Sequence, residues 1–301
     1  MSKKILIAGL INIETTLKIE RFPLVYNPVN YPFFGVNSTV SGVGYNLTKA
    51  LTTLGHRVNF FSMLGDDLAA GQVRQALANI GVSDHNVIQA GAHTAQSVII
   101  YEASGRRQIH TDLKDIQEKT YPIERFDAAA TQADLLTLCN INFSRPFLAR
   151  GRKLNKLIAT DVHTLSNLDD EYNADYMKAA HILFMSDEAL PTTPEAWAKQ
   201  IFNRYPTEIL GIGLGKEGVL LAVRADNFIE RIPAVTVRPV INTIGAGDAL
   251  FSAFLHGYLT SGDPYHAMRQ AVLFAGYKIG VAGAADGFLT SQALAALPQK
   301  P

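Results

Sequence analysis

The chain has 301 residues, 48% of them hydrophobic, which is close to the average of folded globular chains and excludes a disordered or fibrous protein. Its 27 basic and 27 acidic residues give a net charge of zero, so we expect no nucleic-acid partner. No apolar run reaches the ~18 residues that cross a bilayer, and the single cysteine, Cys139, allows no intrachain disulfide; we expect no membrane partner and a cytoplasmic location.

Short runs rich in Val, Ile and Leu alternate with segments of helical period along the whole chain. This alternation is typical of an α/β protein with a mostly parallel sheet. Two helices are expected over residues 47–54 and 73–80, because apolar residues recur there at helical spacing and Gly55 or Gly81 follows. Buried strands are predicted at residues 5–11, 58–63, 135–139, 157–162, 182–185 and 208–212.

Two segments break this alternation. Residues 15–40 alternate polar and apolar side chains, and residues 94–111 resemble a hairpin that turns at residues 104–106. We expect them to pair into a small sheet over the strand ends, where ligands bind in α/β folds. The absence of a Ser- or Gly-rich linker favours one domain with a lid over two independent domains.

Residues 240–248 carry the most informative motif, in which a strand ends, turns tightly and opens a helix. Gly245, Ala246 and Gly247 have almost no side chain, so their backbone N–H groups can approach an anion at the helix N-terminus. Asp248 lies in the same turn and is a candidate general base. The alternative is that Asp248 only complements the helix dipole and the glycines only permit the turn.

The context favours the catalytic interpretation. Residues 242–248 resemble the Asp-Thr-x-Gly-Ala-Gly-Asp signature of the ribokinase-like (PfkB) carbohydrate kinase family, with Asn242 in place of the first Asp. Residues 41–46 are similar to the family's Gly-Gly-x-x-x-Asn signature, with Ser41 in place of the first Gly. Further matches at residues 64–71, 81–82, 105–106 and 214–218 follow in the family's order.

This resemblance implies a ribokinase-like three-layer αβα sandwich with a mostly parallel central sheet and a small β lid. Residues 1–301 would form a single kinase domain, with the lid made by about residues 13–40 and 94–111. The implied activity is transfer of the γ-phosphate of ATP to a primary hydroxyl, with Mg²⁺ as cofactor. Asp248 would be the base, and Gly245, Ala246 and Gly247 would hold the transferring oxygens.

Residues 213–218 match the dinucleotide pattern G-x-G-x-x-G, but they lie between two strand-like runs instead of leading from a strand into a helix. This position argues against a Rossmann dehydrogenase, and a P-loop enzyme is excluded because no Walker sequence occurs. The loop could be a plain β turn. The resemblance instead places it along ATP, which makes Gly213, Gly215 and Gly218 nucleotide-binding candidates, with Gly213 where the family usually has Thr.

The acceptor site implied by the resemblance consists of Asn12, Glu14, Gly42 and Asn46. Asn12 and Glu14 are two residues apart, so on a strand both face one side, and an amide with a carboxylate can grip vicinal hydroxyls. A solvated strand end is the alternative, and Asn46 could bond only within its own helix turn. Glu14 is longer than the family's usual Asp, which leaves the identity of the sugar open.

Metal binding is the least complete part of the pattern. The family's Asn-x-x-Glu motif organises magnesium, and here residues 185–188 read Met-Ser-Asp-Glu, which leaves Glu188 as the candidate or as an ordinary helix-dipole partner. The family's Asp at the position of Asn242 helps to bind a monovalent cation. An uncharged amide there predicts weak or absent K⁺ activation. Asp161 and His163 offer too few ligands for zinc, so we leave them outside the site.

The preferred function is an ATP-dependent kinase for a small ribose- or fructose-like sugar. A nucleoside kinase is one alternative, because aromatic residues of the lid could stack on a base: Tyr26, Tyr31, Phe33 and Phe34. A non-catalytic sugar or nucleotide sensor is another, suggested by four departures from the family pattern: Ser41, Ser186, Gly213 and Asn242. The exposed edges of the lid strands would suit a homodimer contact.

Overall fold

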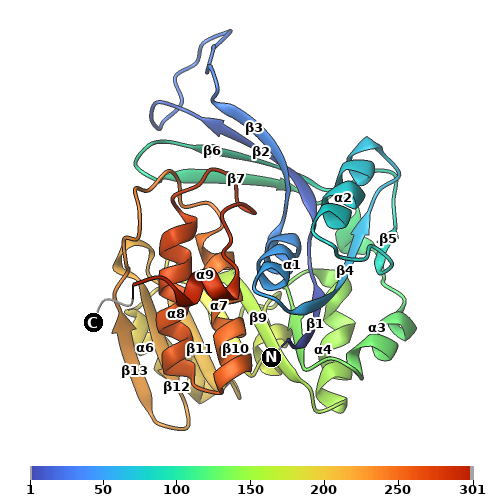
Figure 1. Ribbon diagram of the computed structural model, residues 1–301, viewed down its shortest axis with the longest axis vertical. Helices are drawn as coiled ribbons and strands as arrows, with labels where there is room; N and C mark the ends of the chain where they lie inside the picture. Colours follow the sequence, from blue (N-terminus) through green and yellow to red (C-terminus); the bar gives the residue numbers. More distant parts are fainter. Residues whose placement is uncertain (1, 299–301) are drawn as a thin grey trace.

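The computed structural model describes residues 2–298, and within them the main sheet has nine strands in the order β13-β12-β11-β10-β9-β8-β1-β4-β5 (Figure 1). The strands from β11 to β5 in this order run parallel, whereas β12 is antiparallel to both of its neighbours. Their bounds are β1 Lys4–Ala8, β4 Arg57–Leu64, β5 Val87–Gln89, β8 Leu135–Leu138, β9 Leu157–Thr164, β10 Ile182–Ser186, β11 Ile209–Gly213, β12 Val219–Val223 and β13 Phe228–Ile232.

Helices cover both faces of this sheet. Alternate strand residues point to opposite sides, and the apolar side chains on each side are buried against helices. On β1, Ile5 and Ile7 pack into one core and Leu6 and Ala8 into the other. The first face holds α1 Val43–Thr53, α2 Leu68–Asn79, α7 Ala246–Ser261, α8 Pro264–Lys278 and α9 Ser291–Ala295. The second holds α3 Ile123–Ala130, α4 Arg145–Lys153, α5 Ala174–Ala179 and α6 Pro194–Arg204. The predicted three-layer αβα architecture is therefore confirmed.

The six predicted strands correspond to β1, β4, β8, β9, β10 and β11, and the two predicted helices to α1 and α2. Gly55 and Gly81 follow these helices with φ of 96° and 69°, as expected for helix C-termini. The strand predicted at residues 5–11 is too long, because β1 ends at Ala8. The chain leaves the sheet at Gly9, where a Cβ on Gly44 of α1 would lie 2.6 Å from the Gly9 carbonyl carbon.

A second sheet of four strands has the order β3-β2-β6-β7 and lies above the main sheet in Figure 1. Its strands are β2 Asn12–Lys18, β3 Val36–Ser41, β6 Gln96–Tyr101 and β7 Arg107–Asp112. The predicted hairpin turn is confirmed, with Gly105 at a φ of 90°. Ile99 of β6 packs with Ile244 and Ala284, which ties this small sheet to the loop before α7.

The chain also contains short 3₁₀ turns at Ile116–Glu118, Asn142–Ser144 and Gly215–Glu217. Residues 1 and 299–301 of the predicted kinase unit lie outside the described residues. Over residues 2–298, no helix combines the length and the apolar character needed to span a bilayer.

Candidate active site

The carboxyl ends of the parallel strands meet at one edge of the main sheet, where α/β enzymes bind ligands. The segments that leave this edge carry Asn12 after β1, Asp161 near the end of β9, Glu188 after β10 and Gly213 at the end of β11. The N-terminus of α7 reaches the same edge, because the side chain of Asn46 in α1 bonds to Asp248. Most of the predicted site residues therefore lie on segments that begin at this edge of the sheet.

The first turn of α7 is the segment that the sequence predicts to hold an anion, and we call it the cradle. Gly245, which precedes the helix, has a φ of 76°, and a Cβ there would lie 2.4 Å from the carbonyl oxygen of Ala284. The Ala246 N–H donates to the carbonyl of Thr243 at 3.2 Å. Within residues 2–298, the N–H groups of Gly245 and Gly247 have no hydrogen-bond acceptor, so both are free to meet an anion.

Asp248 is held by one defined hydrogen bond. The side-chain amide of Asn46 donates to Asp248 Oδ2 at 2.6 Å, and Oδ1 has no hydrogen-bond donor among residues 2–298. Burial raises the pKa of Asp248 to about 6, against the lowering effect of the Asn46 hydrogen bond. The charge of Asp161 raises this pKa further, whereas His163 and Lys278 lower it. At neutral pH the Asp248 carboxyl group is therefore mostly ionised. Its pKa is close to the value that suits a general base.

A hydrogen-bonded chain connects Asp248 to Glu14. The Ser41 hydroxyl lies 3.1 Å from Glu14 Oε2 and 3.3 Å from Asn46 Oδ1, and it donates to one of them at a time. Burial raises the pKa of Glu14 to about 6, and the hydrogen bond from Ser41 lowers it while the charge of Asp248 raises it. The departure of Ser41 from the family pattern thus supplies the link between two acidic groups.

Two buried oxygen atoms of the predicted acceptor site lack partners. The Asn12 amide donates to Ser97 Oγ at 3.0 Å, but Asn12 Oδ1 accepts no hydrogen bond within the described chain, and neither does Glu14 Oε1. Asn12 is 3% exposed and Glu14 is 6% exposed. Buried acceptors are normally satisfied, so these two oxygens fit a ligand that brings hydroxyl donors.

The glycine at position 42 shapes the same region. Gly42 has a φ of 100° immediately before α1, and a Cβ there would lie 2.7 Å from the carbonyl oxygen of Leu10. The close approach lets the start of α1 lie against the segment that follows β1. Asn12, Gly42 and Asn46 are thereby brought to one place.

The predicted nucleotide loop is a β11–β12 hairpin with one 3₁₀ turn, so the rejection of a strand-to-helix fingerprint is confirmed. Gly218 has a φ of 107°, and a Cβ there would lie 2.1 Å from the carbonyl oxygen of Ile232. Around Gly215, by contrast, a Cβ would meet no atom within 4 Å. The Gly213 carbonyl accepts a hydrogen bond from the Asp187 N–H at 3.0 Å, which places this loop beside the end of β10.

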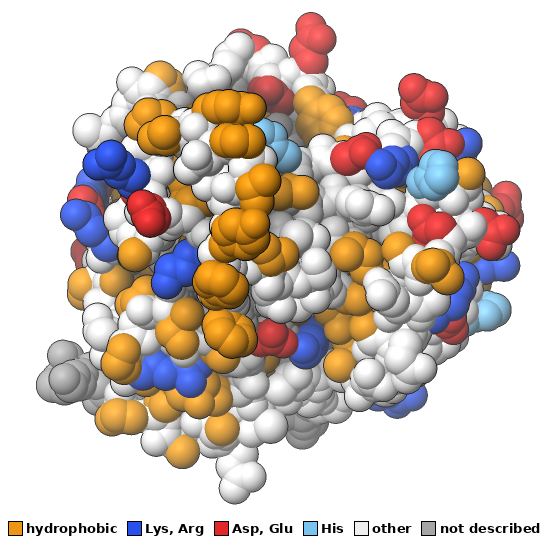
Figure 2. Space-filling model, turned by 90° about the horizontal axis from the view of Figure 1, so that it is seen from above, with side chains coloured by type: hydrophobic (Ala, Val, Ile, Leu, Met, Phe, Trp, Pro, Cys, Tyr) orange, Lys and Arg blue, Asp and Glu red, His pale blue; other side chains and the backbone are white. Residues whose placement is uncertain are grey.

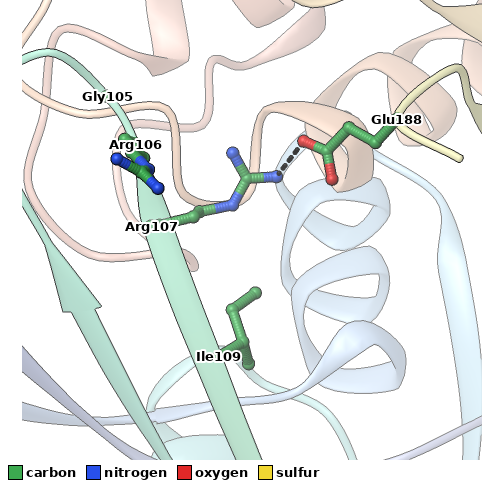
Figure 3. A pocket seen from close by; sticks show the side chains of 5 residues that line it. All are labelled: Gly105, Arg106, Arg107, Ile109 and Glu188. Carbon is green, nitrogen blue, oxygen red and sulfur yellow. Dashed lines mark hydrogen bonds and ion pairs between the residues drawn. The ribbon is translucent and has the colours of Figure 1, made fainter. Parts of the chain in front are cut away.

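Figure 3 shows Glu188 pointing toward Arg107 of the small sheet, and the two form an ion pair at 3.3 Å. Together with Gly105, Arg106 and Ile109 they line a pocket of about 390 Å³. Burial raises the pKa of the neighbouring Asp187, as does the charge of Glu188. No cluster of three or more His, Cys, Asp or Glu side chains suited to a metal occurs in the described chain. Magnesium carried by phosphates needs only one or two protein carboxylates, so Glu188 fits that role.

Lys278 is the main residue of the site that the sequence analysis missed. It ends α8, is fully buried, and donates hydrogen bonds to the carbonyl oxygens of Ile244 and of Gly283, the latter at 2.7 Å. Burial lowers its pKa to about 8. The sequence does hold a signal of this burial. Lys278 follows the buried Phe274 by four residues, so it falls on an apolar helix face, where a lysine is unusual.

Asp161 and His163 were left outside the site, yet both lie close enough to shift the pKa of Asp248 in opposite directions. The backbone N–H of His163 donates to Asp161 Oδ1 at 2.7 Å, and His163 has a φ of 59°, which is uncommon for a residue with a side chain. Nothing in their spacing within the sequence points toward Asp248. Their placement depends on the positions of β9 and α7 in the folded chain.

Comparisons with known proteins point to one family. The model for the pfkB family carbohydrate kinases matches residues 2–291. The acarbose 7(IV)-phosphotransferase of Actinoplanes sp. is 25% identical over 293 residues, which cover 96% of each chain. A microbiome-derived acarbose kinase superposes with a TM-score of 0.86 at 21% identity, over 99% of each chain. Arabidopsis thaliana ribokinase, solved with ribose and ATP, gives 0.79 at 17% identity, also over 99% of each chain.

The family model spans nearly the whole chain, from β1 to the first residue of α9, and includes the helix that presents Asp248. The resemblance inferred from residues 41–46 and 242–248 is therefore confirmed. This protein belongs to the pfkB family of carbohydrate kinases, phosphotransferases that use an alcohol group as acceptor.

Proposed function

We propose that this kinase transfers the γ-phosphate of ATP to a primary hydroxyl of a small ribose- or fructose-like sugar, with Asp248 as the general base. One observation carries the proposal: the chain from Glu14 through Ser41 and Asn46 joins an unsatisfied buried acceptor to the carboxyl group of Asp248 at the N-terminus of α7. A site that only binds ligands has no need of a carboxylate beside an anion cradle.

The acceptor is held by the two unsatisfied oxygens. Asn12 Oδ1 and Glu14 Oε1 each accept a hydrogen bond from a sugar hydroxyl, which removes the cost of leaving buried acceptors unpaired. With the ring anchored there, its CH₂OH group extends toward Asp248. This orientation brings the attacking oxygen near the base before any bond is formed.

In the transfer step the free Asp248 Oδ1 takes the proton of the acceptor hydroxyl as the oxygen attacks the γ-phosphorus in line. The bond from phosphorus to the bridging oxygen breaks, and the leaving ADP keeps that electron pair. The N–H groups of Gly245 and Gly247 donate to the equatorial oxygens, where the α7 dipole also favours negative charge. Ala246 completes the turn through its bond to Thr243.

The nucleotide lies along the loop that carries Gly213, Gly215 and Gly218. Glu188 would hold Mg²⁺, which when bound neutralises phosphate charge. We assign the role of the lid, expected at residues 13–40 and 94–111, to the small sheet together with the arm of residues 19–35. It works as part of one kinase unit and excludes water from the transferring phosphate.

The pH dependence of the reaction follows from the two raised pKa values. Asp248 must be ionised to accept a proton, and its pKa is about 6, so kcat/KM should fall as the pH drops through that value. Glu14 titrates near the same pH and is electrostatically coupled to Asp248, so the apparent values belong to the pair. Acceptor-saturation curves from about pH 5 to about pH 8 measure this profile. A profile that stays flat down to about pH 5 would contradict the assignment.

Substituting Glu14 tests the acceptor site separately from the base. Glu14→Gln removes the charge but keeps the length of the side chain, and the acceptor KM should rise about 10- to 100-fold, with a smaller change in kcat. Thr15→Ala is the matched control, because Thr15 lies next in the strand, faces the opposite side and bonds to Ser38 at 2.8 Å. Equal effects of the two substitutions on KM would show that Glu14 does not contact the acceptor.

The decisive experiment incubates the protein with ATP and Mg²⁺ against a panel of pentoses, hexoses, nucleosides and oligosaccharides. ADP release and the product mass identify the acceptor. Phosphorylation of a nucleoside in preference to every sugar would replace the proposed substrate class with the nucleoside alternative. Binding of an acceptor by calorimetry without phosphorylation of any would support a sensor and refute the kinase proposal.

A larger oligosaccharide is a second candidate acceptor. Figure 2 shows hydrophobic side chains gathered in a stripe across the face seen from above, and the arm exposes Tyr26 at 89%, Phe33 at 83% and Phe34 at 106%. Exposed aromatic rings can pack against the apolar faces of successive sugar rings. Two relatives are kinases of acarbose, so acarbose belongs in the panel. The same stripe would suit the predicted homodimer contact, which sedimentation of the purified protein tests.

A further inference from the structure

The ammonium group of Lys278 has surroundings that the proposed reaction does not explain. Its side chain is 0% exposed at the end of α8. A buried charge is costly unless its hydrogen bonds are satisfied. Within the described chain, this ammonium hydrogen-bonds to two backbone carbonyl oxygens, of Ile244 and Gly283, and it forms no direct ion pair with a carboxylate.

The two carbonyls belong to the segments that flank the anion cradle. Ile244 immediately precedes Gly245, at the start of α7. Gly283 immediately precedes Ala284, whose carbonyl oxygen would lie only 2.4 Å from a Cβ on Gly245. Ile244 and Ala284 also pack together against Ile99 of the small sheet. Lys278 therefore connects the loop that opens α7 with the loop that follows α8.

The monovalent-cation site that the family resemblance implies beside Asn242 does not fit this arrangement. Asn242 is buried, and its side-chain oxygen already accepts the backbone N–H of Ile244 at 3.1 Å. Backbone carbonyl oxygens are the ligands that K⁺ takes when it gives up its hydration shell. Here the carbonyls of Ile244 and Gly283 are already bonded to Lys278.

We propose that the Lys278 ammonium is a built-in monovalent cation that joins the Ile244 and Gly283 loops beside the cradle, so that the kinase needs no added K⁺. This inference rests on the proposed phosphotransferase function for its kinetic consequence, but not for its structural one. Lys278 is a positioning residue: it holds the backbone that presents Gly245 and Gly247 and adds fixed positive charge near the arriving phosphate.

The first test needs no variant. The rate of ADP formation by the wild-type protein is measured in tetramethylammonium buffers of constant ionic strength, with and without KCl. The expected rates agree within about twofold, because the carbonyl site is already filled. Activation by K⁺ of about tenfold or more would overturn the proposal.

The second test removes the ammonium group from its site between the Ile244 and Gly283 carbonyls. Lys278→Ala removes the ammonium and opens space, so kcat should fall at least about tenfold without K⁺ and recover severalfold with K⁺ or NH₄⁺. Tetramethylammonium is too large to restore it. Lys278→Met removes the charge but fills the space, so it should lose activity without rescue. Lys49→Met is the control, because Lys49 pairs with the nearby Asp286 at 3.1 Å and its ammonium does not bond to either carbonyl.

Thermal unfolding supplies a readout that does not depend on catalysis. K⁺ and NH₄⁺ should raise the Tm of Lys278→Ala above its value in tetramethylammonium, and should leave the wild type and Lys278→Met unchanged. This result would support the cation role even if no acceptor were phosphorylated, so failure of the kinase proposal is distinguishable. A folded Lys278→Ala protein without any K⁺ effect on rate or Tm would overturn the inference. If that variant does not fold, the wild-type K⁺ titration decides.

Discussion

The Asp248→Asn variant is expected to lose kcat by about 10²- to 10⁴-fold while it still binds ATP and the acceptor. Asparagine keeps the shape of the side chain and can accept the Asn46 hydrogen bond, but it cannot take the proton of the acceptor hydroxyl. The anion cradle of Gly245 and Gly247 remains intact in this variant. Binding and transfer are therefore separated by one substitution.

The same variant should be no less stable than the wild type at pH 8. Burial raises the folded-state pKa of Asp248 to about 6, so the folded protein holds this proton more tightly than the unfolded chain. The contribution of this proton to the free energy of unfolding is complete below the unfolded-state pKa of 3.8. It is lost as the pH rises through the folded-state pKa of about 6. Above that pH the buried carboxylate costs free energy, which the uncharged Asn avoids.

Steady-state rates, calorimetric titrations with a nucleotide and the acceptor, and thermal melts at pH 8 test these expectations together. Asp84→Asn is a suitable control, because Asp84 is a surface carboxylate paired with Arg74 and remote from the cradle. Retention of more than about a tenth of wild-type kcat by Asp248→Asn would remove Asp248 from the role of base. A lowered melting temperature with lost binding would indicate a structural role instead.

The Gly245→Ala substitution should reduce both activity and stability. Gly245 has a φ of 76°, and its new Cβ would lie 2.4 Å from the Ala284 carbonyl oxygen, so the start of α7 must move. The left-handed backbone alone costs an alanine about 1–2 kcal/mol. Displacing the cradle by about 1 Å costs on the order of 10²-fold in kcat. We expect a fall in Tm of a few degrees together with this loss.

Gly247→Ala is the matched comparison within the same turn. A Cβ on Gly247 would meet no protein atom within 4 Å, and alanine suits a helix better than glycine. This variant should keep or raise its Tm, whereas its methyl group would obstruct only a bound phosphate. Equal melting temperatures for the two variants would contradict the role assigned to Gly245.

Six of the nine strands described in the main sheet were predictable, because most of their residues are buried on both faces. Nearly continuous apolar runs, such as those of β8 and β10, are distinctive in a sequence and need no knowledge of partners. The limits of the arm at residues 19–35 could not be predicted in the same way. Polar and apolar residues alternate through residues 15–40, and this alternation does not show where β2 ends and β3 begins. Pairing between β2 and β3 sets those limits.

The residues of the cradle were recognisable because one short segment holds them all, and a local motif needs no tertiary information. The chain through Ser41 was not, because it depends on how β2, β3 and α1 meet, and serine in place of glycine looked like a loss of function. The role of Lys278 was not predicted for a related reason. Its partners are backbone carbonyls, which every residue carries, so no side-chain pattern marks them.

The hydrogen bond between Asn46 and Asp248 joins residues 202 positions apart, and the Lys49–Asp286 ion pair joins residues 237 apart. Closing such long loops costs conformational entropy before the contacts repay it, so we expect these contacts to form late in folding. On the ribosome, α1 and the first strands emerge long before α7 and α8. Newly made or partly refolded chains should therefore lack kinase activity. The recovery of phosphotransfer during refolding would then measure when α7 and α8 pack into place.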